Sequence, residues 1–263
     1  MPHVTVNGAQ LYYEQHGTGA PIVCIHGTGS AGFVWTAAAR KLAALGRVIV
    51  YDRRGFTRSV RPEPAELTTV REHTEDCRAL LEQLDAIPAV VIGRSYGGSV
   101  ALDLALRCPE AVRSLVLLEA VPFGLSDEMD RWADALTATL EEAAAERGID
   151  AVGEAMMREA LGDWEGLPAE LRELFTANSG AILAETRGGE LLTDPDQLAE
   201  IRVPTLVVSA GESAEVFRNV ADVLSKAIPG ARAVRVEGGH LIDPAGPAVM
   251  AFVVEVLRET ARA

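Results

Sequence analysis

The sequence predicts an α/β fold in which a doubly wound, mostly parallel sheet is interrupted by an inserted group of helices. Three observations support this fold class. Short apolar runs alternate with segments of helical periodicity over residues 22–118, the same alternation resumes over 203–259, and the stretch between them has helical periodicity alone. Repeated strand–helix units produce a parallel sheet with helices on both faces. With 263 residues, 48% of them apolar, the chain can bury one large core.

The chain begins with a predicted antiparallel hairpin. Two strand-like runs, residues 4–6 and 11–14, flank Asn7-Gly8, the dipeptide most typical of a two-residue hairpin turn. The alternation that follows predicts strands over 22–25, 48–51, 90–92 and 112–118, and helices over 34–45, 67–84 and 99–107. After the insertion it predicts strands over 205–209 and 233–236, and helices over 216–228 and 249–259.

The insertion reads as a helical cap. Met129, Trp132, Leu136 and Leu140 recur at helical spacing, with Ser126 in position to cap the start of this helix and Gly148 in position to end it. Further helices are expected over 151–160 and 169–185. We therefore divide the chain into a core, residues 1–121 and 200–263, and a cap, residues 122–199.

Composition limits the partners and the compartment. A net charge of −14 and a pI near 4.8 argue against binding to nucleic acid or to an anionic membrane surface. No run approaches the ~18 apolar residues of a membrane span, and residues 1–10 lack the features of a signal peptide. The three cysteines are an odd count at wide spacing, which favours free thiols in a reducing cytosol over a disulfide framework. We expect a cytoplasmic protein and leave open whether it forms a homodimer.

Ser95 is the candidate nucleophile. It lies in Gly93-Arg94-Ser95-Tyr96-Gly97, between the predicted strand 90–92 and the helix that follows. Such a strand-to-helix corner exposes a hydroxyl above the sheet, and its glycines let neighbouring backbones approach closely.

His240 is the candidate general base. A serine hydroxyl is a poor nucleophile at neutral pH and needs a base, which in turn needs a third group to orient it. Of the five histidines, His240 follows the last strand on a glycine-rich loop at the carboxyl edge of the sheet. His3 and His16 belong to the amino-terminal strands, and His73 is expected on the solvated face of a helix.

The acid has more than one candidate. Glu119 directly follows the strand 112–118, where a carboxylate would be costly without a designated partner. Glu212 and Glu215, after the strand 205–209, are alternatives that can also be read as solvated loop carboxylates. Asp52 ends a strand too, but the adjacent Arg53 and Arg54 suggest an ion-paired structural role. We choose Glu119.

The turn at residues 26–30, His-Gly-Thr-Gly-Ser, is the candidate oxyanion site. Acyl transfer develops a negative oxygen that needs preorganised N–H donors, and the Thr28 amide, together with the Tyr96 amide at the serine corner, would supply them. A phosphate-binding loop is the competing interpretation. It lacks support because no Gly-x-Gly-x-x-Gly pattern, Lys-Ser/Thr pair or acidic ribose partner accompanies the turn.

Taken together, these motifs resemble the α/β-hydrolase family over nearly the whole chain. The matching elements, in the family's order, are His26-Gly27 with Trp35, the Asp-Arg-Arg-Gly-Phe-Thr-Arg-Ser run at 52–59, the corner at 93–97, and Gly239-His240 with Pro247. The resemblance implies an eight-stranded, mostly parallel sheet, a cap after the sixth strand, a serine hydrolase triad, and no cofactor or metal.

One departure from the family pattern supports Glu119. Many members carry an aspartate shortly after the seventh strand, where Gly211-Glu212-Ser213-Ala214 offers alanine instead. Some relatives place a glutamate after the sixth strand, and the zearalenone lactonases are an example. Haloalkane dehalogenases and epoxide hydrolases would require aspartate at Ser95, and a hydroxynitrile lyase typically uses a lysine near the base, so these activities are disfavoured.

The function expected from the resemblance is hydrolysis of an apolar carboxylic ester or lactone through Ser95, His240 and Glu119 and an acyl-enzyme. Met156, Met157, Trp164 and Phe175 are candidates for an apolar ceiling under the cap. We expect His26, Trp132, Met156 and Trp164 to contact the substrate. Three alternatives remain open: a cofactor-free perhydrolase, a carbon–carbon bond hydrolase with the same triad, and a ligand-binding receptor on the same scaffold.

Overall fold

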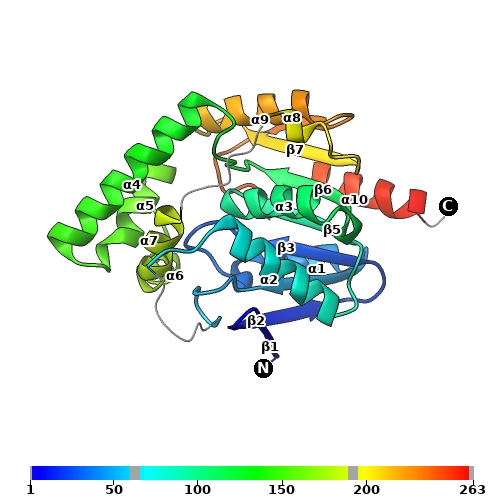
Figure 1. Ribbon diagram of the computed structural model, residues 1–263, viewed down its shortest axis with the longest axis horizontal. Helices are drawn as coiled ribbons and strands as arrows, with labels where there is room; N and C mark the ends of the chain where they lie inside the picture. The colour runs from blue at the N-terminus through cyan, green and yellow to red at the C-terminus, as the bar shows by residue number, and fades with distance from the viewer. Residues whose placement is uncertain (1, 60–65, 189–194, 261–263) are drawn as a thin grey trace.

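Eight strands form one sheet in the computed structural model, which describes residues 2–59, 66–188 and 195–260 (Figure 1). The order is β1-β2-β4-β3-β5-β6-β7-β8; β1, β2 and β4 pair antiparallel, and the pairs from β4 through β8 are parallel. This confirms the predicted doubly wound, mostly parallel sheet. The strands are β1 His3–Val6, β2 Ala9–His16, β3 Pro21–Ile25, β4 Arg47–Tyr51, β5 Ala89–Arg94, β6 Val112–Leu118, β7 Thr205–Ala210 and β8 Arg232–Val236.

Alternate residues of the central strands pack against different helices. Val23 and Val91 belong to one apolar cluster, with residues of α2, α3 and α9, whereas Ile22 and Ile92 belong to a second, with residues of α1 and α10. Successive side chains of a strand point to opposite faces, so the two clusters lie on opposite sides of the sheet. These helices are α1 Thr36–Leu42, α2 Val70–Gln83, α3 Tyr96–Arg107, α9 Glu215–Ala227 and α10 Pro247–Thr260; two short 3₁₀ helices span Gly32–Trp35 and Pro109–Ala111.

The chain between β6 and β7 is helical, as its periodicity indicates. Its helices are α4 Asp127–Arg147, α5 Ala151–Leu161, α6 Ala169–Ala177, α7 Ser179–Arg187 and α8 Pro195–Leu198, and α4–α7 gather at one end of the sheet in Figure 1. Ser126 Oγ accepts a hydrogen bond from the Met129 amide at 3.2 Å, and Gly148 ends α4 with a φ of 88°, so both predicted caps are present. We call α4–α7 the inserted helices. Their division from the core at residues 122 and 199 stays a prediction.

Two details of the helices differ from the predictions. The helix expected over 169–185 is divided at Asn178, whose side chain bonds to the core instead of solvent. The helix expected from residue 67 begins at Val70, because Thr69 and Glu72 form a capping box. Within the described ranges no helix is long and apolar enough to cross a membrane. All three cysteines are unpaired, and Cys24 and Cys77 are buried.

Candidate active site

Ser95 occupies a strained corner between β5 and α3. Its backbone has φ 55° and ψ −124°, a region that non-glycine residues rarely adopt and that costs on the order of 1–3 kcal/mol. The Ser95 amide donates to the Leu118 carbonyl at 2.9 Å, which ties the corner to the end of β6. The strain is tolerated because the surrounding strands fix the backbone, and the side chain is left partly exposed.

The glycines on either side of Ser95 are required by space. A Cβ on Gly93 would lie 2.2 Å from the Gly97 carbonyl oxygen, and a Cβ on Gly97 would lie 2.2 Å from the Ile25 carbonyl oxygen. Gly27 faces the same corner, since a Cβ there would be 3.1 Å from the Ser95 Cβ. The glycine turn and the serine corner therefore lie against each other.

Glu119 and His240 form a buried pair. Glu119 follows β6 in a left-handed conformation, with φ 43°, and its Oε2 accepts a hydrogen bond from His240 Nδ1 at 2.7 Å. The same carboxylate accepts from the Ala210 amide at 2.8 Å through Oε1 and from Ser213 Oγ at 2.8 Å through Oε2. Glu119 is 1% exposed, and these bonds replace the water that a buried carboxylate loses.

The segment after β7 contributes a hydroxyl to the Glu119 carboxylate. Glu212 and Glu215 are exposed to solvent, whereas Ser213 is buried and donates to Glu119. The pairing of His240 with Glu119 thus follows the choice made from the sequence. The contribution of Ser213 was not predicted, although the missing aspartate at this point of the sequence was a signal for it.

The His240 ring packs on an aromatic side chain that sequence reasoning missed. Phe217, in the first turn of α9, stacks on the imidazole with a centroid distance of 4.4 Å and an interplanar angle of 27°. Trp132 on α4 contacts the edge of Phe217 at 5.2 Å. Phe217 therefore packs between Trp132 and His240.

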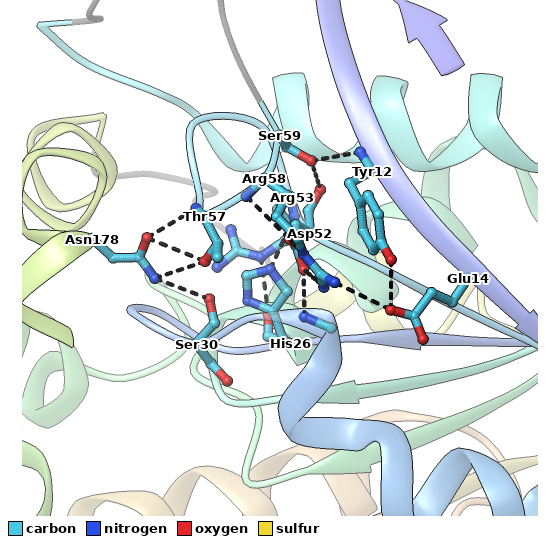
Figure 2. Close-up of polar contacts among 11 residues, drawn as sticks. Tyr12, Glu14, His26, Ser30, Asp52, Arg53, Thr57, Arg58, Ser59 and Asn178 are labelled. Atoms are coloured by element: carbon cyan, nitrogen blue, oxygen red, sulfur yellow. Dashed lines mark hydrogen bonds and ion pairs between the residues drawn. The ribbon is translucent and has the colours of Figure 1, made fainter. Parts of the chain in front are cut away.

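The glycine turn is held by polar contacts from the core and from an inserted helix (Figure 2). The Arg53 amide donates to His26 Nε2 at 2.9 Å, and the Arg53 Nε donates to the His26 carbonyl at 2.9 Å. Because Nε2 accepts, the proton lies on Nδ1, which is 2.8 Å from the Gly27 carbonyl. Burial, reinforced by the Arg53 charge, holds the pKa of His26 well below its usual value. The buried His26 side chain thus helps to hold the glycine turn in place.

Two further side chains fix the end of this turn. Asp52 Oδ1 accepts from the Gly32 amide at 2.7 Å, and Asn178 Nδ2 donates to the Gly29 carbonyl at 2.8 Å. Asn178 Nδ2 also lies 3.4 Å from the Ser30 carbonyl (Figure 2). Asn178 also accepts from the Thr57 amide at 2.9 Å through Oδ1. Thr28, between the fixed residues, is half-buried and faces the cavity described below.

A buried ion pair joins α7 to the core. Arg53 forms a charge-assisted contact with Glu185, and His73 Nε2 lies 3.1 Å from Glu185 Oε1; all three side chains are at most 1% exposed. Burial alone would raise the pKa of Glu185, but the Arg53 charge and the His73 contact outweigh it and lower that pKa to about 2. The expected solvated position of His73 is wrong, because its ring packs against Phe56 and Tyr96 and lies beside Glu185 of α7. Asp52 is ion-paired as expected, but its partner is Arg58.

A cavity of about 260 Å³ lies over Ser95 and His240. Of the candidate residues, it is lined by Ser95, Thr28, His240 and Met156, and also by Met157 and Phe175. His26 and Trp132 do not line it, and Trp164 lines a separate surface hollow with Asp150 and Arg172. Arg94 and Ile242 line the cavity without having been predicted to. The remaining lining residues are Gly27, Ser30, Val34, Ala160, Leu161, Leu171, Leu241, Asp243 and Pro244.

The arrangement suits acid–base and nucleophilic chemistry. A histidine oriented by a buried carboxylate and a serine on a strained corner share one mostly apolar cavity. In the described ranges, the Ser95 hydroxyl has no hydrogen-bond partner, and no group of three or more His, Cys, Asp or Glu side chains has the arrangement of a metal site.

This chain is similar to known hydrolases in sequence and in fold. The "Putative carbamate hydrolase RutD" of Azorhizobium caulinodans is 29% identical over 95% of this chain and 95% of its own length. Est816, solved as an N-acyl homoserine lactone degrading enzyme, superposes with a TM-score of 0.74 and 26% identity over 98% of this chain and 99% of that one. An esterase from Thermogutta terrifontis has the same fold, with a TM-score of 0.78 and 24% identity over 100% and 98% of the two chains. A family model described as the alpha/beta hydrolase family matches residues 22–251. This chain therefore belongs to the alpha/beta hydrolase family.

Proposed function

We propose that this enzyme hydrolyses a carboxylic ester or lactone through a Ser95-His240-Glu119 triad. The observation that carries the proposal is the hydrogen bond of 2.7 Å between Glu119 Oε2 and His240 Nδ1, on a histidine that shares its cavity with Ser95. A carboxylate on one ring nitrogen fixes the tautomer that leaves the other nitrogen free to accept a proton.

The reaction proceeds through an acyl-enzyme. Ser95 Oγ attacks the substrate carbonyl while His240 Nε2 takes its proton, and the resulting imidazolium is stabilised by Glu119. The oxyanion accepts hydrogen bonds from the Thr28 and Tyr96 amides. His240 then returns the proton to the leaving alcohol, and a water molecule deacylates the serine by the same steps. A hydrogen bond between nucleophile and base commonly tightens only when substrate is bound.

The inserted helices would act as a cap that supplies the apolar part of the site. Met156 and Met157 on α5 and Phe175 on α6 line the cavity opposite the serine corner, so an apolar acyl or alcohol group would be sheltered there from water. The activities named for RutD and Est816, a carbamate hydrolase and a lactone-degrading enzyme, both transfer an acyl group to water and support the same reaction class.

The test is the Ser95→Ala variant. It should abolish turnover of short-chain nitrophenyl esters and covalent labelling by a fluorophosphonate probe, while its circular dichroism spectrum and urea midpoint stay close to the wild-type values. Labelling that persists in Ser95→Ala would contradict the assignment of the nucleophile. Labelling of the wild type without steady-state turnover would favour a ligand receptor over an enzyme.

A further inference from the structure

Arg94 is a buried cation in the wall of the cavity. It directly precedes Ser95, is 7% exposed, and lines the same space as Ser95 and His240. Removing a guanidinium from water is costly unless an opposite charge and hydrogen-bond acceptors replace the solvent. Its contacts within the protein therefore show how far this cost is met.

Few contacts within the protein compensate Arg94 for the loss of its hydrating water. Over residues 2–59, 66–188 and 195–260, the one hydrogen bond of its side chain runs from Nη1 to the Ile242 carbonyl at 3.4 Å, and no carboxylate lies within ion-pair distance of its guanidinium. Its guanidinium lies 5.4 Å from the centre of the Trp35 ring. A guanidinium has five N–H donors, so most of them lack a partner in this part of the chain.

Other buried arginines of this chain are treated differently. Arg53 contacts the Glu185 carboxylate, and Arg54 binds Asp76 through two nitrogens. Both of these side chains lie outside the cavity lining, whereas Arg94 lies within it. The fold thus pairs its structural arginines and leaves the one beside the nucleophile without a carboxylate.

Asp243, the carboxylate among the residues that line the cavity in the described part of the chain, is engaged elsewhere. Its side chain is half exposed, and its oxygens accept from Lys41 Nζ at 3.0 Å and from the Ala245 amide at 2.9 Å. Burial lowers the pKa of Arg94 to about 10, and Asp243 opposes this shift from a distance. The guanidinium is therefore still charged at neutral pH, and among the described residues that line the cavity Asp243 is the only carboxylate.

We propose that Arg94 binds a carboxylate on the substrate, so that the enzyme acts on esters or lactones that carry a second, ionised carboxyl group. This inference rests on the proposed function and narrows its substrate class. A carboxylate matches the planar fork of a guanidinium and can accept two of its unpaired N–H groups at once. The apolar surface of Met156, Met157 and Phe175 would contact the carbon chain between the two carboxyl groups.

The experiment compares matched pairs of substrates. Each pair consists of the nitrophenyl half-ester of a dicarboxylic acid and the nitrophenyl alkanoate of equal chain length, and kcat/KM is measured for both. The wild type should prefer the half-ester at its best chain length, because a charge-assisted hydrogen bond inside a protein discriminates by about 10-fold or more. The ratio of the two kcat/KM values is the readout.

Three variants locate the preference. In Arg94→Met the ratio should fall about 10-fold or more, and in Arg94→Lys it should fall less, because the charge stays but the fork is lost. The matched control is Arg232→Met, which removes a guanidinium that also stacks on an aromatic ring, Phe252 at 4.8 Å, but lies at the start of β8. The control should leave the ratio unchanged.

A purely structural role for Arg94 gives a different result. If Arg94 only held the Ile242 carbonyl, two residues after His240, Arg94→Met would lower kcat/KM for both substrates alike, and the inference would be wrong. A wild type without any preference for half-esters would overturn it as well. Should Arg94→Met fail to fold, the wild-type ratio and Arg94→Lys still decide.

Binding without chemistry separates this inference from the proposed function. In the Ser95→Ala background, monoamides of dicarboxylic acids and the corresponding uncharged amides are titrated by thermal shift, with and without Arg94→Lys. Stabilisation by the charged amide that depends on Arg94 supports the carboxylate site even if no ester is hydrolysed. Ester turnover with no such stabilisation leaves the proposed function standing and removes this inference.

Discussion

Glu119 shows how a single residue is prepared for its role. Its backbone is held at φ 43°, and its two oxygens accept three hydrogen bonds, from Ala210, Ser213 and His240. Two donors come from the end of β7 and the segment after it, and the third comes from the loop after β8, so the carboxylate cannot turn away without leaving buried partners unsatisfied. The orientation of His240 is therefore set by Glu119, Ala210 and Ser213, which do not line the cavity.

We expect Glu119→Gln to lower kcat by about 100-fold or more, because a neutral amide cannot stabilise the imidazolium and can favour the wrong ring tautomer. Glu212→Gln and Glu215→Gln serve as controls, since both carboxylates are exposed and neither contacts His240. Steady-state kinetics on one nitrophenyl ester compares the three. A larger loss in either control than in Glu119→Gln would move the acid to the segment after β7.

Ser213 gives a second prediction at this scale. Ser213→Ala removes one donor to the Glu119 carboxylate, and we expect kcat to fall by about 10-fold, the cost of one hydrogen bond to a charged group. KM should change little because Ser213 does not line the cavity. Ser213→Thr keeps the hydroxyl and should restore most of the activity. A change in KM alone would show that the positioning role is wrong.

Candidate site residues at the ends of strands were easier to predict from the sequence than site residues on helices. Ser95, Glu119 and His240 follow three parallel strands whose carboxyl ends meet at one edge, so their strand-end positions predict that they converge. Phe217 carries no such signal. It occupies an apolar position of an amphipathic helix. The sequence pattern cannot distinguish a residue that stacks on His240 from an ordinary core residue.

At the scale of elements, a buried ion pair attaches the inserted helices to the core. The Arg53 and Glu185 side chains are fully buried, and each compensates the charge of the other. Two other polar contacts of the same interface come from Asn178, at the junction of α6 and α7. The inserted helices and the glycine turn are thus held to the same polar cluster (Figure 2).

Glu185→Gln should lower the free energy of unfolding by about 3–5 kcal/mol, because it leaves the buried Arg53 charge without its counterion. Glu141→Gln is the matched control. It removes the partner of Arg187, also on α7, but both of those side chains are exposed, so its effect should be about 1 kcal/mol or less. Urea denaturation measures both. Equal effects would mean that the buried pair contributes no more than a surface pair.

Several helix boundaries in the insertion were predictable from local signals: the helix expected over 151–160 is α5, Ala151–Leu161. Ser126 and Gly148 delimit α4 as expected. The break at Asn178 was missed because the periodicity continues through it, and its cause is a pair of hydrogen bonds to Thr57 and Gly29, far away in the chain. Contacts of this kind override local preference, and a local pattern cannot report them.

On the scale of the whole molecule, the order of motifs was sufficient to predict the sheet. What it did not predict is the polar interior beneath the inserted helices. His73 was expected in solvent because Glu72, Glu75 and Asp76 surround it in sequence, yet Asp76 is buried too and binds Arg54. The buried face of α2 therefore carries charged residues that are paired inside the protein. In the sequence, such a face looks the same as a face exposed to solvent.

Two buried histidines, His26 and His73, make the stability of the whole protein depend on pH. Burial lowers the pKa of both His26 and His73, and the charge of Arg53 adds to the effect. In the unfolded chain a histidine has a pKa of about 6.5, so below that pH the unfolded state binds protons that the folded state does not. The contribution of the two neutral histidines to the free energy of unfolding is therefore fully present above pH ~6.5 and is lost as the pH falls below it.

We expect the free energy of unfolding to fall by up to about 2.7 kcal/mol per pH unit below pH ~6, since each of the two histidines contributes at most about 1.36. Glu185 adds a second loss at lower pH, between its unfolded value of about 4.3 and the folded pKa of about 2. Urea titrations at a series of pH values measure the slope. His73→Gln removes one of the two groups and should reduce the upper slope by about half. A slope that is the same in wild type and His73→Gln would show that His73 is not held neutral in the folded protein.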